Sequence, residues 1–320
     1  MSQEIELKFR IPAERLSALQ RALATSSARR LALAARYYDT PDQRLAAARM
    51  ALRLRREGEQ WVQTLKAQGA TALHRLEHNQ VLPGRRSPVL DAGRHRGTPA
   101  GEALQRLLEQ AGQPPLVERY ATEVQRTLRV VRHQGARIEL ALDLGRLRAG
   151  GLQQPIAELE LELLQGPPQA LLDLAGRWAR RFDLLLDSRS KSERGHHLAL
   201  AAAAIAGGSR EPVAVLAASP PAQPVPGRRR TLAQAVQTLL AHASQIADGP
   251  WTTAHLQALR RDLRGLHARL PEGEPLAALQ RLRSRLAAAR GAGAAPSVGE
   301  MLREPEAQSL WLGLIGLSLG

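Results

Sequence analysis

Strict alternation of apolar and charged residues recurs along the first two hundred residues, and it is typical of β-strands with one apolar and one ionic face. Residues 4–11 show it first, with two glutamates, a lysine and an arginine on one face and apolar side chains on the other. On this segment alone, a sheet edge with a solvated face explains the pattern. The alternation returns, however, at residues 51–55, 61–66, 137–143 and 156–163.

The charges on these faces are segregated by sign, which bears on where the faces point. Residues 156–163 place three glutamates on one face, and like charges at neighbouring positions repel each other. A closed antiparallel barrel with its charged faces turned inward resolves this, because acids of some strands then face bases of others. For residues 156–163 alone, an acidic solvent face remains the alternative. The acids are Glu4, Glu6, Glu139, Asp143, Glu158, Glu160 and Glu162, and the bases are Lys8, Arg53, Arg55, Lys66, Arg75, Arg126 and Arg137.

Such a lining indicates the class of ligand. Carboxylates without histidine or cysteine favour hard cations such as Mg²⁺ or Mn²⁺ over zinc. Lysine and arginine would then neutralise an anion that the metal also contacts, and a polyphosphate-like chain is the simplest such anion. The formal net charge of +15 agrees with an anionic partner.

Composition disfavours several other classes of protein. The chain has no cysteine, which excludes disulfides, thiolate metal sites and cysteine nucleophiles. Aromatic residues make up only 3%, and zinc-finger and RNP-like motifs are missing, so nucleic acid is not the expected partner. No stretch reaches the ~18 apolar residues of a membrane span, and the first residues do not resemble a secretory signal. We therefore expect a cytoplasmic protein that does not act at a membrane.

Lysine usage points to individual positions. Only three of the 45 basic residues are lysines, namely Lys8, Lys66 and Lys191. So strong a preference for arginine suggests that lysine persists where a compact ammonium cannot be replaced by a planar guanidinium. All three lysines are therefore candidate functional residues.

The chain divides into two parts of different pattern. Helical spacing is predicted at residues 13–23 and 102–111 and after Pro167-Pro168, between the predicted strands. We expect an α+β domain over residues 1–205, a linker rich in Ala, Pro, Gly and Ser over 206–229, and a small all-α domain over 230–320. Helices are predicted at about 232–247, 253–269 and 275–290, and the apolar tail 310–319 has no assigned role.

The ordered motifs resemble the CYTH, or triphosphate tunnel metalloenzyme, superfamily. Glu4-x-Glu6-x-Lys8 is similar to the family's N-terminal signature. The likeness covers about residues 1–200, and all three lysines fall on motif positions. The later motifs, in order, are Tyr37-Tyr38-Asp39-Thr40-Pro41, Leu52-Arg53-Leu54-Arg55, Thr64-Leu65-Lys66, residues 138–143, residues 158–162 and Ser190-Lys191-Ser192-Glu193-Arg194-Gly195.

This resemblance implies an eight-stranded antiparallel β-barrel, or tunnel, with flanking helices, which binds a triphosphate compound and two divalent ions. By resemblance, Glu4 and Glu6 are metal ligands, joined by one or more of Glu158, Glu160 and Glu162. The expected triphosphate ligands are Lys8, Arg53, Arg55, Lys66, Arg126, Lys191 and Arg194, and the expected catalytic residues are Lys8, Lys66, Asp143 and Glu160.

Bacterial members of the family with a helical second domain resemble inorganic triphosphatases, which convert PPPi into PPi and Pi. The mechanistic hypothesis is in-line attack of a metal-activated water on a terminal phosphorus, with lysine and arginine stabilising the developing charge. The helical part resembles a short, divergent CHAD domain, a polyphosphate-binding partner of such tunnels. Its best match is the segment from His255 through Arg260, Arg261 and Arg264, although a helix-packing role explains His255 as well.

Two other functions stay open. Thiamine triphosphatases and adenylate cyclases would use the same charged tunnel lining. They need, however, an aromatic or apolar surface that binds the organic group, and aromatic residues are few. A non-catalytic polyphosphate-binding module would tolerate loss of the metal-binding acids, which this chain retains.

Overall fold

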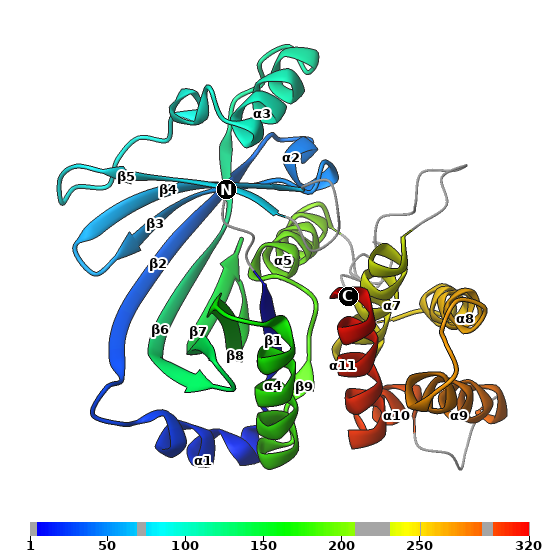
Figure 1. The fold of residues 1–320 in the computed structure, drawn as a ribbon. Coiled ribbons are helices and arrows are strands. Elements are labelled where there is room, and N and C mark those ends of the chain that lie inside the picture. Colours follow the sequence, from blue (N-terminus) through cyan, green and yellow to red (C-terminus); the bar gives the residue numbers. More distant parts are fainter. Residues whose placement is uncertain (1–4, 69–74, 209–230, 250, 290–296, 320) are drawn as a thin grey trace.

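A long, strongly curved antiparallel sheet forms the first part of the molecule, and a group of helices packs beside it (Figure 1). The computed structural model describes residues 5–68, 75–208, 231–249, 251–289 and 297–319. The expected metal ligand Glu4 and nearly all of the expected linker lie outside these residues.

The sheet contains nine strands in the order β5-β4-β3-β2-β6-β7-β8-β1-β9. Its antiparallel pairing confirms the predicted fold class, and the additional strand is the two-residue β9, too short to give an alternation signal. Among the described residues, no pairing joins the end strands β5 and β9. The strands are β1 (Glu6–Arg10), β2 (Arg29–Asp39), β3 (Ala51–Glu57), β4 (Gln60–Gln68), β5 (Arg75–Leu82), β6 (Val117–His133), β7 (Ala136–Ala149), β8 (Leu152–Gln165) and β9 (Leu185–Leu186).

Strand register brings the predicted charged faces together. In antiparallel pairs, residues directly opposite each other point to the same face. Glu6 of β1 lies opposite Glu162 of β8, and Lys8 lies opposite Glu160. On the other side of β8, Glu158 lies opposite Asp143 of β7. One continuous ionic surface therefore crosses β7, β8 and β1 on the concave face of the sheet.

Helices cover the two faces of the sheet differently. Helix α4 packs on the apolar outer side, where Leu171, Trp178 and Phe182 join the main hydrophobic cluster. Helix α5 instead packs against the concave face, where Leu198 and Ala199 meet apolar residues of β2, β6 and β7. The helices of this part are α1 (Ala13–Leu23), α2 (Arg44–Ala47), the 3₁₀ turn η1 (Ala92–His95), α3 (Pro99–Gln110), α4 (Pro168–Phe182) and α5 (Lys191–Ala206).

The remaining helices form a small bundle whose core is continuous with that of the sheet. The apolar tail is helical: Trp311, Leu314 and Ile315 of α11 are buried in the same cluster as α4. His255 is buried in a cap of α8, where its Nδ1 accepts from Thr252 N at 3.1 Å. These helices are α7 (Leu232–Asp248), α8 (Thr253–His267), α9 (Glu274–Ala288), α10 (Val298–Arg303) and α11 (Pro305–Leu319).

Several elements extend beyond their predicted bounds. Strand β2 begins at Arg29, eight residues before the Tyr37–Pro41 motif, because the Arg29–Leu33 stretch pairs with β6 despite its exposed arginines. Helix α3 begins at Pro99, three residues before the helix predicted at 102–111. In the part of the chain that the structure describes, no helix has the length and apolarity needed to cross a membrane.

A glycine on α5 permits the close approach of this helix to the sheet. A Cβ at Gly195 would lie 2.2 Å from Cδ2 of Tyr120, a contact that no side chain can make without movement. We expect Gly195→Ala to lower the free energy of unfolding by about 1–3 kcal/mol, the typical cost of overpacking. Gly265→Ala, on an open face of α8 with nothing within 4 Å, should instead stabilise by up to ~1 kcal/mol. Urea unfolding followed by circular dichroism compares the two, and equal effects would contradict this account.

Candidate active site

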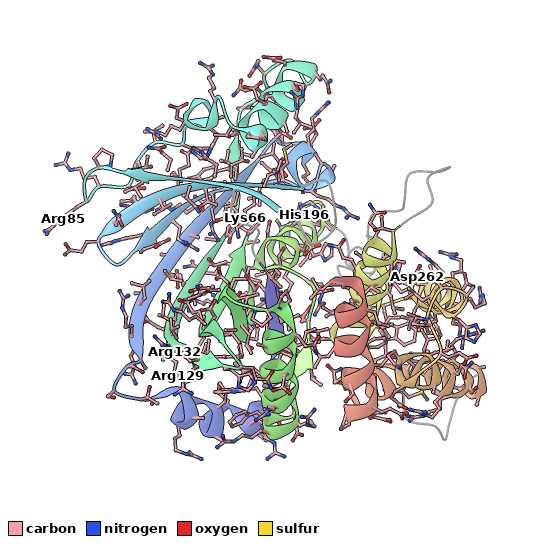
Figure 2. All side chains as sticks on the ribbon, viewed as in Figure 1. Lys66, Arg85, Arg129, Arg132, His196 and Asp262 are labelled. Carbon is pink, nitrogen blue, oxygen red and sulfur yellow. The ribbon has the colours of Figure 1, made fainter. Side chains whose placement is uncertain are left out.

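The concave face of the sheet encloses a cavity of about 710 Å³. Helices α2, α5 and α7 complete its walls, so the helical bundle contributes to the same space. Figure 2 shows Lys66 of β4 and His196 of α5, which both line it. The predicted residues that line this cavity are Glu6, Lys8, Arg53, Arg55, Lys66, Arg126, Asp143, Glu160, Glu162 and Lys191.

The wall made by β3 and β4 is basic. Arg53 donates through Nη1 to the hydroxyl of Tyr37 at 3.2 Å, and Arg55 donates through Nε to Glu57 at 2.6 Å. Lys66 forms an ion pair with Glu77 of β5 at 2.6 Å. These three cations protrude from adjacent strands, so they present one positively charged surface to the cavity.

The side chain of Glu77 is held ionised by its neighbours. Burial alone would raise its pKa, but Lys66 and a 2.9 Å hydrogen bond from Asn79 lower the pKa to about 2. Sequence alone indicates Glu77 only weakly, because it does not place the pairing of β5 with β4. The register shows Glu77 directly opposite Lys66.

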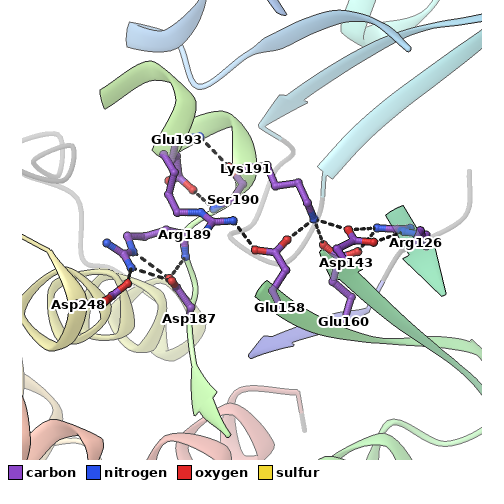
Figure 3. A network of polar contacts seen from close by, with 11 residues as sticks. Arg126, Asp143, Glu158, Glu160, Asp187, Arg189, Ser190, Lys191, Glu193 and Asp248 are labelled. Atoms are coloured by element: carbon purple, nitrogen blue, oxygen red, sulfur yellow. Dashed lines mark hydrogen bonds and ion pairs between the residues drawn. The ribbon is translucent and has the colours of Figure 1, made fainter. Parts of the chain in front are cut away.

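The opposite wall holds an ammonium group among three carboxylates (Figure 3). Lys191 Nζ lies 2.7 Å from Asp143 Oδ2 and 2.7 Å from Glu160 Oε1, and it also forms an ion pair with Glu158. Burial acts to lower the pKa of Lys191, but Glu160 and the other two carboxylates raise it far above its ordinary value. Lys191 is therefore charged at any physiological pH.

Arg126 of β6 completes this cluster from the other side. Its Nε and Nη2 each donate to a different oxygen of Asp143 at 2.6 Å, and Nη2 also contacts Glu160 at 2.5 Å. Although burial favours the neutral form of Glu160, the charges of Lys191, Arg126 and Lys8 lower its pKa below the ordinary range. Glu160 is consequently a weak base, better suited to binding a cation than to accepting a proton.

Two predicted residues lie behind the cavity wall. Arg194 of α5 forms an ion pair with Glu158, and these residues are 6% and 1% exposed. Neither is among the residues that line the cavity in the described part of the chain. Arg194 contacts the carboxylate that also binds Lys191, so its position suits neutralisation of buried charge.

The acids suit a hard divalent cation by the chemistry of their donors, which are carboxylate oxygens alone. Oxygens of Asp143, Glu158 and Glu160 lie within 4.8 Å of one another. Each of these three carboxylates, however, contacts arginine or lysine through both of its oxygens. Glu162 and Glu6, directly opposite each other, extend the acidic surface from Glu160 along the cavity.

The Tyr37–Pro41 motif proves to order the rim of the cavity. Asp39 is buried and accepts from the backbone nitrogens of Thr40, Leu45 and Ala46 at 2.7, 2.8 and 3.0 Å. These bonds hold the turn that leads into α2, whose Ala46 faces the cavity. The sequence marked the motif, but it did not distinguish this structural role from a catalytic one.

A stacked pair of tyrosines closes the cavity near α5. The rings of Tyr37 and Tyr120 lie 4.6 Å apart at 17°, and Tyr120 exchanges a 2.9 Å hydrogen bond with Ser192. Burial acts to raise the pKa of Tyr37, but Arg53 outweighs burial and lowers it. Tyr120 belongs to none of the sequence motifs, so the local sequence does not indicate this contact.

Comparison with known proteins gives a family and a relative of stated activity. The CYTH domain family matches residues 2–196. An inorganic triphosphatase from Haemophilus influenzae is 35% identical over 206 residues, which are 62% of this chain and 55% of that protein. The chain therefore spans about half the length of this curated relative.

Solved structures that resemble this chain include two described as putative adenylate or adenylyl cyclases. One, from Bacillus halodurans, is 16% identical with a TM-score of 0.42, and the match covers 60% of this chain and 98% of that one. Another, from Hippeastrum and described with a dominant triphosphatase activity, is 17% identical with a TM-score of 0.43, covering 60% and 95%.

The Lys66–Glu77 pair predicts a pH-dependent stability. The pKa of Glu77 falls from its ordinary 4.5 to about 2 on folding, so its contribution is complete above pH 4.5 and is lost as the pH falls towards 2. We expect Glu77→Gln to lower the free energy of unfolding by about 1–3 kcal/mol at pH 7, and by less at pH 3.5. Urea unfolding at the two pH values measures this difference.

The exposed pair of Glu59 with Arg85 provides the control. Their side chains are 73% and 82% exposed, and Arg85 lies at the far tip of the sheet (Figure 2). Glu59→Gln should change the stability by less than ~1 kcal/mol at either pH, because exposed ion pairs contribute little. A Glu77→Gln effect that stays constant from pH 7 to pH 3.5 would show that the carboxylate charge is not its source.

Proposed function

This chain belongs to the CYTH domain family, and from that membership we propose that it is a metal-dependent hydrolase that converts inorganic triphosphate into diphosphate and phosphate. The observation that carries the proposal is the cavity itself, where a basic wall of β3 and β4 faces an acidic wall of β7, β8 and β1. The 35% identical triphosphatase supports the choice of activity.

The basic wall suits a short chain of phosphates. Arg53, Arg55 and Lys66 present charge from neighbouring strands, and guanidinium groups bind phosphate oxygens in pairs. Lys8 and Lys191 add positive charge from the opposite side of the cavity. A triphosphate between these walls would be neutralised along its length, and charge developing on a leaving diphosphate would be stabilised by groups already in position.

The metal would be held on the acidic wall. We assign it to Glu6, Glu160 and Glu162, because these carboxylates face the cavity. Glu4, two residues before Glu6 in the sequence, would be a further ligand. We expect Mg²⁺ or Mn²⁺, up to two ions, since the donors are all oxygens. When bound, such an ion would supply Lewis-acid chemistry, polarising phosphoryl oxygens and lowering the pKa of a water ligand.

The buried acids would then bind and neutralise the lysine and arginine side chains of the site. Asp143 binds Arg126 through two hydrogen bonds, and Glu158 binds Lys191 and Arg194. In this role they orient the lysine and arginine toward the substrate and offset the cost of burying them. Because the pKa of Glu160 is lowered, we expect this residue to remain ionised throughout turnover.

The lining also favours inorganic over organic triphosphates. Tyr37 is the only Phe, Tyr or Trp among the described lining residues, and one face of its ring is covered by Tyr120. Because Tyr37 is also only 4% exposed, a base or thiamine ring has no open phenylalanine, tyrosine or tryptophan ring on which to stack. This argues against a nucleotide cyclase or a thiamine triphosphatase.

A non-catalytic polyphosphate-binding module is the second candidate. The groove between α8 and α9 supports it, because Arg260, Arg264 and Arg283 line a hollow of about 370 Å³ there. A module that only binds polyphosphate, however, gives no reason for the acidic wall with Glu6, Glu160 and Glu162, because these glutamates repel an anion unless a metal intervenes. We therefore rank it below the hydrolase.

Phosphate release tests the proposed activity. We expect release from PPPi with Mg²⁺ or Mn²⁺, none with EDTA, and release from ATP, thiamine triphosphate and long-chain polyphosphate slower by at least about tenfold, since specific contacts to one substrate typically give this discrimination. Tight polyphosphate binding in EDTA without any hydrolysis would support the binding module instead.

Single substitutions test the two walls. Lys66→Ala and Glu160→Ala should each lower kcat by roughly 10²-fold or more, because each removes a charge held ready for the transition state. Both should retain the wild-type circular dichroism spectrum. Arg261→Ala, on an exposed face of α8, is the control and should keep full activity. Near-wild-type hydrolysis in both site variants would contradict the assignment of the cavity.

A further inference from the structure

The segment between β9 and α5 lies against the helical bundle, which binds its backbone at two points. Leu186 N donates to Gln308 Oε1 of α11 at 2.7 Å. Ser188 N donates to Ser244 Oγ of α7 at 3.1 Å. Residues far along the chain therefore fix the course of this segment.

Arg189 connects the same segment to the end of α7 (Figure 3). Its Nε and Nη2 donate to the two oxygens of Asp187 at 2.9 and 2.7 Å, and Nη2 also donates to Asp248 Oδ2 at 3.1 Å. Gln245 lies 3.4 Å from Nη1. Asp248 forms a further ion pair with Arg10 of β1, so one carboxylate joins the helical bundle to both the sheet and this segment.

The first turn of α5 connects this anchored segment to the cavity. Ser190 Oγ accepts from Glu193 N at 3.1 Å, and Glu193 Oε2 accepts from Ser190 N at 2.7 Å, which forms a capping box. Lys191, the first residue of the helix, follows directly. Arg189, whose side chain binds Asp187 and Asp248, thus lies two residues before Lys191, whose ammonium group contacts the three buried carboxylates.

We propose that Asp248 is a positioning residue for the hydrolysis, acting through Arg189 to hold Lys191 in place, so that the helical bundle is part of the catalytic unit. The inference rests on the proposed function, in which Lys191 binds the triphosphate. Asp248 is not among the described residues that line the cavity, so it does not act on the substrate directly. Displacements of about 1 Å in a positioned group can cost up to 10²-fold in rate.

Kinetics of full-length variants provide the first readout. Asp248→Asn keeps the size of the side chain but removes its charge, and we expect kcat for PPPi to fall about tenfold, within the range for a misplaced group. Asp248→Glu should recover most of the rate, because it restores a carboxylate. Ser244→Ala, which removes the contacts of this hydroxyl with Ser188 N and Ser188 Oγ, should give a smaller loss in the same direction.

Glu304→Gln is the matched control. The carboxylate of Glu304 forms a two-point ion pair with Arg285 in the same helical bundle, so the substitution breaks a bundle ion pair that does not involve Arg189 or its partners. We expect it to lower the melting temperature about as much as Asp248→Asn while leaving kcat unchanged. A general loosening of the bundle would instead lower kcat equally in both variants.

The scarcity of lysine permits a second readout that does not depend on activity. Because the chain contains only three lysines, ¹³C-labelled lysine gives three side-chain Cε signals, which Lys→Arg variants assign. Asp248→Asn should shift or broaden the signal of Lys191 and leave that of Lys66 unchanged. Glu304→Gln should alter neither signal.

The outcomes separate this inference from the proposed function. A displaced Lys191 signal together with a lower kcat supports the positioning role. An unchanged Lys191 signal in folded Asp248→Asn, or in Ser244→Ala if that variant alone folds, overturns it whatever the rate. If the wild-type protein hydrolyses no PPPi, the proposed function fails, and the spectra alone then decide whether Asp248 positions Lys191.

Discussion

The burial of like charges on one concave face is the constraint on which this structure depends. Asp143, Glu158 and Glu160 come from two adjacent strands and point into the same space, where their mutual repulsion would be severe if they were not neutralised. Lys191 from a helix and arginines from a strand and a helix provide the opposite charges. The sheet and helix α5 must therefore form together, because each supplies part of the charges that balance this cluster.

Much of the sheet and of the cavity could be predicted from the sequence, because a period of two fixes which side chains share a face. The pattern predicted most strands and nine of the residues that line the cavity, and the scarcity of lysine added Lys191 as a tenth. It does not fix the register between strands distant in sequence, so the pairing of Lys66 with Glu77 was not predictable. Ser190–Gly195 was marked only as a motif, and the structure shows that Ser190 and Glu193 form a capping box and that Arg194 then lies behind the wall.

The helical part was harder to interpret from its sequence, for a physical reason. Three of its helices lie close to their predicted bounds, but periodicity does not show that their apolar faces pack partly against the sheet domain. The C-terminal apolar run is an example: without a partner it resembles a tail of no assigned role, yet Trp311 and Leu314 complete a core that begins at β1. Polar contacts at this boundary, such as Ser188 with Ser244, leave no trace in local periodicity.

The bond from Leu186 to Gln308 joins residues 122 positions apart, and this separation has a consequence for biosynthesis. A ribosome finishes every strand of the sheet long before residue 308 emerges, so a nascent chain can close the cavity while the segment before α5 still lacks its distant partner. Contacts of such long range form late, after the entropy of a large loop has been lost. An arrested nascent chain would thus contain all of the lining residues of the sheet and yet lack the bond from α11 that holds the backbone at the end of β9.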